Sequence, residues 1–137
     1  MKISNSVKFW KQELSNIGNC TIGENCVIHS HVWIGDDVKI GDNCKIQAFS
    51  FIPTGVRIGN NVFIGPRVTF TNDKYPPSGK WGITIVEDNV SIGAGAIILP
   101  GLTLSRGCKI GAGAVVTKNV GAWEIVVGNP AKVLDTK

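Results

Sequence analysis

The stretch Ile-Gly-Asp-Asp-Val-Lys-Ile-Gly-Asp-Asn-Cys-Lys-Ile, residues 34–46, contains two consecutive copies of a six-residue unit. Each unit begins with an aliphatic residue and often continues with glycine and two turn-forming residues. A small or β-branched fifth residue and a variable sixth residue complete it. The unit recurs from Asn16 to Val120 with one interruption. A short, fixed period of this kind indicates a solenoid rather than an ordinary β-sandwich.

The first position of the unit is its most regular feature, because fourteen of its sixteen occurrences are Ile, Leu or Val. We predict that the first and fifth positions point inward, that three units close one triangular coil, and that the aliphatic residues each contribute roughly 1.5–3 kcal/mol on burial. The first positions are Asn16, Ile22, Ile28, Ile34, Ile40, Ile46, Ile52, Ile58, Ile64, Phe70, Val86, Ile92, Ile98, Leu104, Ile110 and Val116. The fifth positions are Cys20, Cys26, Val32, Val38, Cys44, Ser50, Val56, Val62, Val68, Thr84, Val90, Ala96, Leu102, Cys108, Ala114 and Val120.

The two residues between these inward positions are suited to sharp turns. Pairs such as Asp36-Asp37, Asp42-Asn43 and Asn60-Asn61 combine side chains that tolerate the left-handed region or hydrogen-bond their own backbone. Each coil therefore has three corners, and residues one coil apart stack on each other.

Composition limits the function classes. The 137 residues are enough for one domain, and the net charge of +4 comes from lysines and arginines that are scattered along the chain. This pattern favours a phosphate-bearing small ligand at least as much as nucleic acid, and no run of basic residues marks a nucleic-acid groove. The sequence has neither a signal-peptide pattern nor the roughly 20 apolar residues of a membrane span. We expect a soluble, cytoplasmic protein without a nucleic-acid or membrane partner.

The four cysteines follow the repeat and form no CxxC pair. We interpret Cys20, Cys26, Cys44 and Cys108 as small core residues in a reducing compartment, not as disulfide partners or metal ligands.

Residues 1–15 precede the repeat. Val7, Trp10 and Leu14 have the spacing of one apolar helical face, which predicts a short helix or irregular cap over the end of the domain. The predicted organisation is a cap at 1–15, a repeat domain at 16–121 and a C-terminal extension at 122–137.

The interruption is one turn that has grown to twelve residues, 72–83. Phe70 and Thr71 begin a unit, Thr84 and Ile85 end it, and the repeat resumes in phase. We expect this loop to leave a corner of the prism, where it can reach an adjacent subunit and help form a site. A linker would not need the aromatic and proline residues that the loop carries.

The repeat, together with the motifs at residues 92–96, 110–120 and 126–132, resembles the hexapeptide-repeat acyltransferases. The resemblance covers about residues 16–133. It implies an all-β fold, a left-handed parallel β-helix of about five coils with one extruded loop. It also implies a homotrimer that binds acetyl-CoA in grooves between neighbouring prisms.

One column of turns becomes nearly bare toward the C-terminus: Ser30-His31, Ala48-Phe49, Pro66-Arg67, Ala94-Gly95 and Ala112-Gly113. Bare turns expose backbone groups to a ligand, and in the resembling family the comparable residues contact the pantetheine arm of the coenzyme. The resemblance therefore assigns coenzyme binding to Ala94, Gly95, Ala112, Gly113, Lys118, Pro130 and Lys132. Lys118 and Lys132 would hold the phosphates, with Arg106 as a weaker candidate.

The loop lacks a histidine. O-acetyltransferases of the resembling fold carry a catalytic histidine just before a proline in this loop, because a hydroxyl nucleophile needs a general base. Tyr75 stands before Pro76 here, and a tyrosine with a pKa near 10 is a poor base at neutral pH. An amine, partly neutral already at that pH, needs orientation more than a base.

The string Phe-Ile-Gly-Pro-Arg-Val-Thr-Phe-Thr-Asn-Asp-Lys-Tyr-Pro-Pro, residues 63–77, is similar to that of N-acetyltransferases acting on nucleotide-linked amino-deoxy sugars, of the dTDP-3-amino-3,6-dideoxyhexose type. Pro77 departs from the family pattern, which commonly has arginine there, and this leaves the acceptor's identity open. The resemblance implies N-acetylation by direct attack of the sugar amine on the thioester.

The candidate site residues follow from this reading. The candidate catalytic residues are Asn72, Asp73, His31 and His29, and the candidate substrate-binding residues are Arg67, Tyr75 and Trp81. Asn72 and Asp73 would hold the amine or a sugar hydroxyl, the two aromatic residues would stack on sugar or base, and a histidine would serve as a base if one is needed. No metal is required.

Three alternatives differ in class. An O-acetyltransferase of a sugar or small-molecule hydroxyl would use the same coenzyme groove. A non-catalytic trimeric scaffold would not need the loop or the lysine pair. A zinc-dependent carbonic anhydrase of this fold needs three histidines, whereas the sequence has only His29 and His31.

Overall fold

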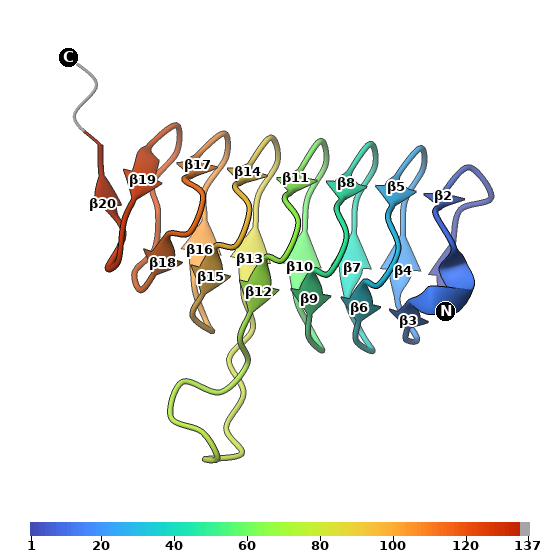
Figure 1. Ribbon diagram of the computed structural model, residues 1–137, viewed down its shortest axis with the longest axis horizontal. Helices are drawn as coiled ribbons and strands as arrows, with labels where there is room; N and C mark the ends of the chain where they lie inside the picture. Colours follow the sequence, from blue (N-terminus) through green and yellow to red (C-terminus); the bar gives the residue numbers. More distant parts are fainter. Residues whose placement is uncertain (135–137) are drawn as a thin grey trace.

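Residues 1–134 of the computed structural model are described, and they wind into a left-handed parallel β-helix built from three sheets (Figure 1). Sheet A comprises β1 (Lys2–Ile3), β4 (Thr21–Ile22), β7 (Lys39–Ile40), β10 (Arg57–Ile58), β13 (Ile85–Val86) and β16 (Thr103–Leu104). Sheet B comprises β2 (Lys8–Phe9), β5 (Val27–Ile28), β8 (Lys45–Ile46), β11 (Phe63–Ile64), β14 (Ser91–Ile92), β17 (Lys109–Ile110), β19 (Ile125–Val127) and β20 (Lys132–Val133). Sheet C comprises β3 (Asn16–Ile17), β6 (Trp33–Ile34), β9 (Phe51–Ile52), β12 (Thr69–Phe70), β15 (Ile97–Ile98) and β18 (Val115–Val116).

The core lies along the axis of the prism and confirms the predicted inward positions. Ile22 pairs with Ile40 and Ile28 with Ile46, so identical positions stack one coil apart. Of all the predicted inward positions, only Asn16 and Leu102 are not buried. The alternation of an inward and an outward residue within each short strand thus follows directly from the six-residue unit.

The glycine that often follows the aliphatic residue has a steric cause. A Cβ on Gly93 would lie 2.6 Å from the backbone nitrogen of Ala112, and one on Gly41 would lie 2.7 Å from the carbonyl oxygen of Gly59. Coils stacked at strand spacing leave no room for a side chain there.

The helical face predicted for residues 1–15 is wrong. Instead, β1 and β2 pair in parallel with β4 and β5, and Ile3 and Phe9 pack against the core. Trp10 and Leu14 are each 49% exposed, and the one helical segment within residues 1–134 is the 3-10 turn η1 (Gln12–Leu14).

The register of the first coil also differs from the prediction. Ile17 pairs with Ile34 and points inward, whereas Asn16 is exposed. The turn around η1 lengthens one corner of this coil, so the chain enters the regular repeat one residue later than the pattern alone predicts.

The predicted count of about five coils is too low. Sheets A and C have six strands each, and β19 begins a further coil on sheet B, so residues 1–134 form six full coils and part of a seventh. β20 then pairs antiparallel with β19. The predicted C-terminal extension continues to residue 137, and residues 135–137 lie outside the described part.

The cysteines are core residues, as predicted. All four are free and buried. Burial raises the pKa of the Cys108 thiol to about 11 and also raises that of Cys20. Within residues 1–134, no group of three or more His, Cys, Asp or Glu side chains is placed to hold a metal ion. None of the helices in the same range is long and apolar enough to cross a membrane.

The loop at residues 72–83 leaves the prism between β12 and β13, and Figure 1 shows it projecting away from the coils. Phe70 and Thr84, the two inward residues that flank it, are both fully buried. Phe70 pairs with Ile98 and Ile58 with Val86, so the ladder continues in phase across the loop. The prediction of a single expanded turn is confirmed.

Candidate active site

The three corners of the prism differ in how their backbone groups are satisfied. We call the corner that leads from sheet A to sheet B the ladder corner (residues 24–25, 42–43, 60–61, 88–89 and 106–107). There the Oδ1 atoms of Asp42, Asn60 and Asp88 accept hydrogen bonds from the turn N–H one coil earlier, at 2.8, 2.8 and 2.7 Å. Every such side chain is thereby used to hold neighbouring coils together.

The corner that leads from sheet B to sheet C, which we call the open corner (residues 30–31, 48–49, 66–67, 94–95 and 112–113), lacks this ladder. The N–H groups of Gly95 and Gly113 bond to the carbonyls of Pro66 and Ala94. The N–H groups of Ala94 and Ala112 have no acceptor within residues 1–134. Alanine has no side-chain oxygen to supply one, so these two backbone donors in successive coils are left unpaired among the described residues, as are the N–H groups of Ser30 and Ala48 lower in the column.

The glycines of the open corner leave space beside these donors. A Cβ added to Gly95 or Gly113 would meet nothing within 4 Å. The predicted coenzyme-binding residues Ala94, Gly95, Ala112 and Gly113 therefore form a bare track of two coils, in which the Ala94 and Ala112 N–H groups have no acceptor among the described residues.

Below the track, the same corner carries large side chains. The rings of His31 and Phe49 stack with centroids 4.8 Å apart and an angle of 11°, and the Arg67 guanidinium carbon lies 4.8 Å from the Phe49 ring centroid. His31 Nδ1 lies 3.1 Å from the Ser30 hydroxyl. His29 is not part of this stack, because its ring stacks on Trp10 at 5.9 Å.

A hollow of about 310 Å³ lies at the C-terminal end of the prism. Its lining includes Lys118 and Lys132, so the structure brings together the two lysines that the sequence nominated for phosphate binding. Pro130 is exposed in the turn between β19 and β20. Arg106 does not line this hollow. It lines a separate one of about 640 Å³ on sheet A, together with Lys39 and Arg57.

The loop is organised around Asp73. The Asp73 carboxylate accepts hydrogen bonds from the Ser78 hydroxyl at 2.6 Å, the Gly79 N–H at 3.0 Å and the Tyr75 N–H at 3.1 Å. The Ser78 hydroxyl bond, followed by the backbone bonds, lowers the pKa of Asp73 below its ordinary value of 3.8. This predicted catalytic carboxylate thus directs its oxygens to the loop itself.

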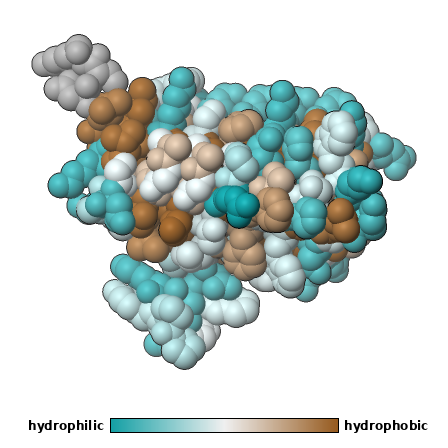
Figure 2. Space-filling model, in the orientation of Figure 1, coloured by the Kyte–Doolittle hydropathy of each residue, from teal (hydrophilic) through white to brown (hydrophobic). Residues whose placement is uncertain are grey.

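The other predicted loop residues are more accessible. Asn72 is half-buried at the base of the loop, where its carbonyl accepts the Gly82 N–H at 2.9 Å. Tyr75 and Trp81 are 73% and 60% exposed, and both line an apolar hollow of about 490 Å³ between the loop and Pro100. Figure 2 shows the loop as a mostly hydrophilic arm beyond the body of the prism.

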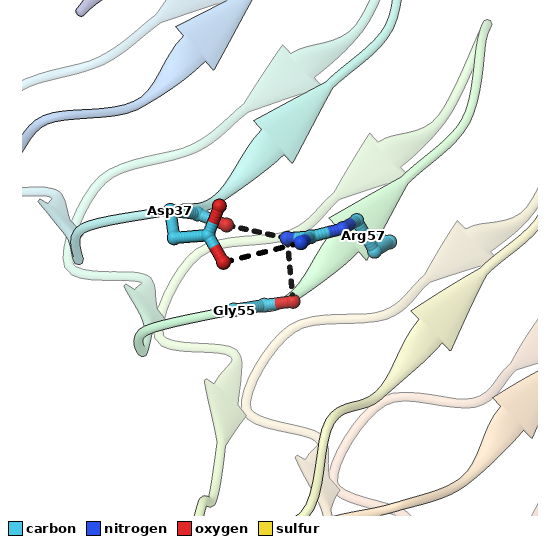
Figure 3. A network of polar contacts seen from close by, with 3 residues as sticks. All are labelled: Asp37, Gly55 and Arg57. Carbon is cyan, nitrogen blue, oxygen red and sulfur yellow. Dashed lines mark hydrogen bonds and ion pairs between the residues drawn. The ribbon is translucent and has the colours of Figure 1, made fainter.

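A polar network braces the corner next to the loop (Figure 3). The Arg57 guanidinium donates to the Gly55 carbonyl at 2.8 Å, to the Asp37 carbonyl, and to the Asp37 carboxylate at 3.2 Å. A Cβ on Gly55 would lie 3.4 Å from the side chain of Ile83, the last residue of the loop. The network therefore ties together two turns of the corner from which the loop departs.

Sheet C separates the loop from the open corner. Its outward face is largely apolar, with Trp33 and Phe51 in contact at a centroid distance of 6.1 Å and with Ile97 38% exposed. One chain therefore brings His31 and Arg67 together on one edge of this face, while it places Asn72 and Asp73 on the other edge. Phe49 was placed in this column by the repeat but was given no role, and its contacts with His31 and Arg67 appear only in the structure.

Two sequence models of repeat families match the chain. The model described as the hexapeptide repeat of succinyl-transferase matches residues 18–52 and 83–118, and the model described as bacterial transferase hexapeptide (six repeats) matches residues 37–72. The first alone covers more than half of the sequence. The chain belongs to the hexapeptide-repeat transferase family.

Individual members of the hexapeptide-repeat transferase family agree with this assignment. A Schizosaccharomyces pombe protein that bears the name of an acetyltransferase is 45% identical over 80 residues, which cover 53% of this chain and 39% of that protein. The 2,3,4,5-tetrahydropyridine-2,6-dicarboxylate N-acetyltransferase of Staphylococcus aureus is 42% identical over 74 residues, covering 54% of this chain and 30% of the enzyme.

A solved structure of the same fold is PerB from Caulobacter crescentus, in complex with CoA and GDP-perosamine. It matches with a TM-score of 0.74 and 25% identity, covering 98% of this chain and 54% of PerB. The chain thus spans well under half the length of the two curated relatives and about half of PerB.

Proposed function

We propose that the protein is an acetyl-CoA-dependent N-acetyltransferase that acylates the amino group of a nucleotide-linked amino-deoxy sugar. The observation that carries the proposal is the open corner, where two unsatisfied backbone N–H groups lie beside two glycines on the same column as Arg67. PerB, which shares the fold, binds CoA and a GDP-linked sugar, GDP-perosamine.

In this proposal the bare track holds the coenzyme arm. The pantetheine moiety has amide carbonyls, one of which can accept from the N–H of Ala112, while the N–H of Ala94, one coil closer to Arg67, is left for the reacting carbonyl. Lys118 and Lys132 supply cations for the coenzyme phosphates at the C-terminal hollow. Pro130 would contact the nucleotide end. The thioester then lies at the foot of the track, near Arg67.

The chemical step needs little acid–base assistance. The neutral amine attacks the thioester carbonyl carbon, the C–N bond forms, and the C–S bond breaks as the thiolate leaves. A backbone N–H of the open corner stabilises the oxyanion. Asn72 orients the amine, and the proton leaves through water or through His31, while His29 remains a secondary candidate base.

Asp73 has a different role from the one its sequence position suggests. Its three hydrogen bonds within the loop support a role in shaping the loop, which then presents Asn72, Tyr75 and Trp81. In this arrangement Tyr75 and Trp81 stack on the sugar or the base.

We propose a homotrimer in which the loop of one subunit meets the open corner of the next. The apolar outward face of sheet C, with Trp33 exposed and Phe51 half-buried in the single chain, supports a subunit contact there. Such a contact would join the two halves of the site that sheet C separates. Analytical ultracentrifugation checks the subunit number.

An acceptor amine that carries carboxylates is a second candidate. The observation that favours it is the 42% identity to the Staphylococcus aureus enzyme, whose substrate is a dicarboxylate. The two candidates share the coenzyme and the reaction and differ in the anionic group of the acceptor.

The test measures thiol release from acetyl-CoA by the purified chain with amino sugars linked to dTDP, UDP and GDP, with amino dicarboxylates, and with matched hydroxyl acceptors. We expect turnover on an amine and none on the hydroxyl series. Turnover confined to hydroxyl acceptors would establish O-acetylation. If acetyl-CoA does not stabilise the protein in a thermal-shift measurement, the protein is a non-catalytic scaffold instead.

A further inference from the structure

The open corner contains a stack of three side chains that the proposed chemistry does not fully use. His31, Phe49 and Arg67 occupy the same turn position in three successive coils, and each contacts the next at 4.8 Å between ring centroids or between the guanidinium carbon and a centroid. Phe49 lies in the middle and touches both neighbours.

The backbone at these positions is strained. The φ angles of His31, Phe49 and Arg67 are +59°, +66° and +59°. Non-glycine residues in this region cost on the order of 1–3 kcal/mol each unless a short polar side chain compensates. The ladder corner uses such side chains at the equivalent positions, namely Asn25, Asn43, Asn61 and Asn89. Strained positions occupied by large residues are typical of functional sites.

The stack ends abruptly at Arg67. The next two residues in the column are Gly95 and Gly113, and the space above both is empty to at least 4 Å from an added Cβ. Coils are separated by about 4.8 Å, so no side chain projects from this column for roughly 10 Å above Arg67, and we call this bare part of the corner the recess. Arg67 therefore forms the floor of the recess through which the bare track runs.

The recess offers donors and a positive charge. Arg67 has no hydrogen-bond acceptor and no ion-pair partner within residues 1–134, where the ion pair between Arg57 and Asp37 is the one present. The unsatisfied N–H of Ala94 lies in the coil directly above. A guanidinium with no partner among the described residues fits an anion, and it pairs best with a planar carboxylate or with a phosphate.

We propose that Arg67, held in place by Phe49 and His31, binds an anionic group of the acceptor and so selects acceptors whose amine is carried by an anion. The inference rests on the proposed function and narrows its substrate class. The shared chemistry is a carboxylate or a phosphate that reaches the foot of the track while the amine faces the thioester.

Phe49 is a positioning residue in this scheme. Its ring restricts the guanidinium to one side of the column, so less side-chain entropy is lost when the anion binds. His31 supports the other face of the ring. Neither ring needs to touch the acceptor's anionic group.

The kinetic test compares Arg67→Gln with wild type on three acceptors: a nucleotide-linked amino sugar, an amino dicarboxylate, and the dimethyl ester of that dicarboxylate. Loss of a charge-assisted hydrogen bond raises KM about 10- to 100-fold. We expect this increase for the acceptor whose anion Arg67 binds. The ester has no carboxylate, so its KM should already be high with the wild-type protein and should change little in Arg67→Gln. Equal effects on the dicarboxylate and its ester, with no effect on the nucleotide-linked sugar, would overturn the inference.

The positioning role of Phe49 is tested separately. Phe49→Leu should raise KM for the same acceptor with kcat nearly unchanged, and Phe49→Tyr, which keeps the ring, should restore the wild-type value. Phe63→Leu is the matched control, because it removes an exposed phenylalanine ring outside the stack. If Phe49→Tyr behaves like Phe49→Leu, the ring does not act through stacking.

A binding measurement keeps this inference separate from the proposed reaction. The Arg67 Nε–H signal, assigned by its loss in Arg67→Gln, is followed by NMR during titration with inorganic pyrophosphate and with pyridine-2,6-dicarboxylate. A saturable shift with either ligand supports the anion site even if no acetyl transfer is found, and the stronger ligand identifies the source of the anion. If neither ligand shifts the signal, the proposed anion site is wrong.

Discussion

The ladder corner and the open corner have the same backbone geometry and opposite chemistry. In the ladder corner, Asp42, Asn60 and Asp88 saturate the turn N–H groups of the preceding coil. In the open corner, no side chain supplies such an acceptor, and the N–H groups of Ser30, Ala48, Ala94 and Ala112 are left unpaired among the described residues. A solenoid can thus keep its stability in one corner and reserve another for ligands, because each corner is satisfied independently of the others.

The largest effect is expected when a side-chain acceptor is added to the open corner, so that it resembles the ladder corner. Ala112→Asp places a carboxylate one coil above Ala94, as Asp88 is placed above Asn60, so it should capture the Ala94 N–H. We expect catalysis to fall about a hundredfold, because one donor is lost and a negative charge faces the coenzyme. Steady-state kinetics and acetyl-CoA titration measure the effect.

The same substitution should slightly stabilise the fold, by about 0.5–1.5 kcal/mol for the new hydrogen bond. Ala122→Asp is the matched control, since it adds the same charge elsewhere on the prism. Wild-type activity in Ala112→Asp, with the carboxylate seen bonded to Ala94, would remove that N–H from the site.

The converse change opens the ladder corner. Asp88→Ala removes the acceptor of the Asn60 N–H and should cost about 0.5–1.5 kcal/mol of unfolding free energy, since water replaces the bond only in part. Activity should not change. Asp88→Asn should be close to wild type, because Asn60 already fills this role with an amide oxygen. Urea denaturation gives the comparison, and a loss of activity at full stability would argue against a purely structural corner.

The stability of the loop at residues 72–83 is expected to depend on pH. The pKa of Asp73 is lowered in the folded chain by the Ser78 hydroxyl and by backbone N–H groups. A depressed carboxylate pKa stabilises the folded loop above the ordinary value of 3.8, and this contribution disappears as the pH falls through the folded-state pKa. We expect Trp81 fluorescence to report loop disordering below pH 3.8, while the coils remain intact by circular dichroism.

Asp73→Asn should weaken the loop at neutral pH in the same way, because a neutral amide oxygen is a poorer acceptor for three donors. An acid transition of unchanged midpoint in this variant would show that another group controls the loop.

The smallest effect is expected at the brace beside the loop. Asp37→Asn removes the charge from the pair with Arg57 while two carbonyl contacts remain. Because Asp37 is exposed, we expect a change of about 0–1 kcal/mol, further reduced by salt. Thermal unfolding at low and high ionic strength measures it. A larger loss would mean that the brace holds the loop as well as the turn.

Most of the fold was predictable from the sequence, because the repeat is local and each unit carries its own inward residues and turn. The errors lie at the N-terminal end. Ile3 and Phe9 are six residues apart and flank a turn at Asn5-Ser6, but this unit is offset by one residue from the later repeat, so the pattern that begins at Asn16 does not include it. The turn at η1 also lies outside the six-residue pattern, so the period could not predict that Ile17 rather than Asn16 points inward.

The candidate site was predictable only in its parts. The bare residues of the open corner and the pair of Lys118 and Lys132 followed from spacing and resemblance, and the structure places the lysines around one hollow. The three hydrogen bonds of Asp73 depend on the path of an irregular loop, which no period specifies.

The sequence by itself determined which residues point inward, where the turns fall, and that the loop is one expanded turn, because these depend on a period that each unit repeats. Only the tertiary structure decided which N–H groups remain free, that Phe49 joins His31 to Arg67, and that sheet C separates the loop from the open corner. Those properties depend on contacts between coils, where the side chain one coil away determines whether a backbone donor is satisfied or left for a ligand.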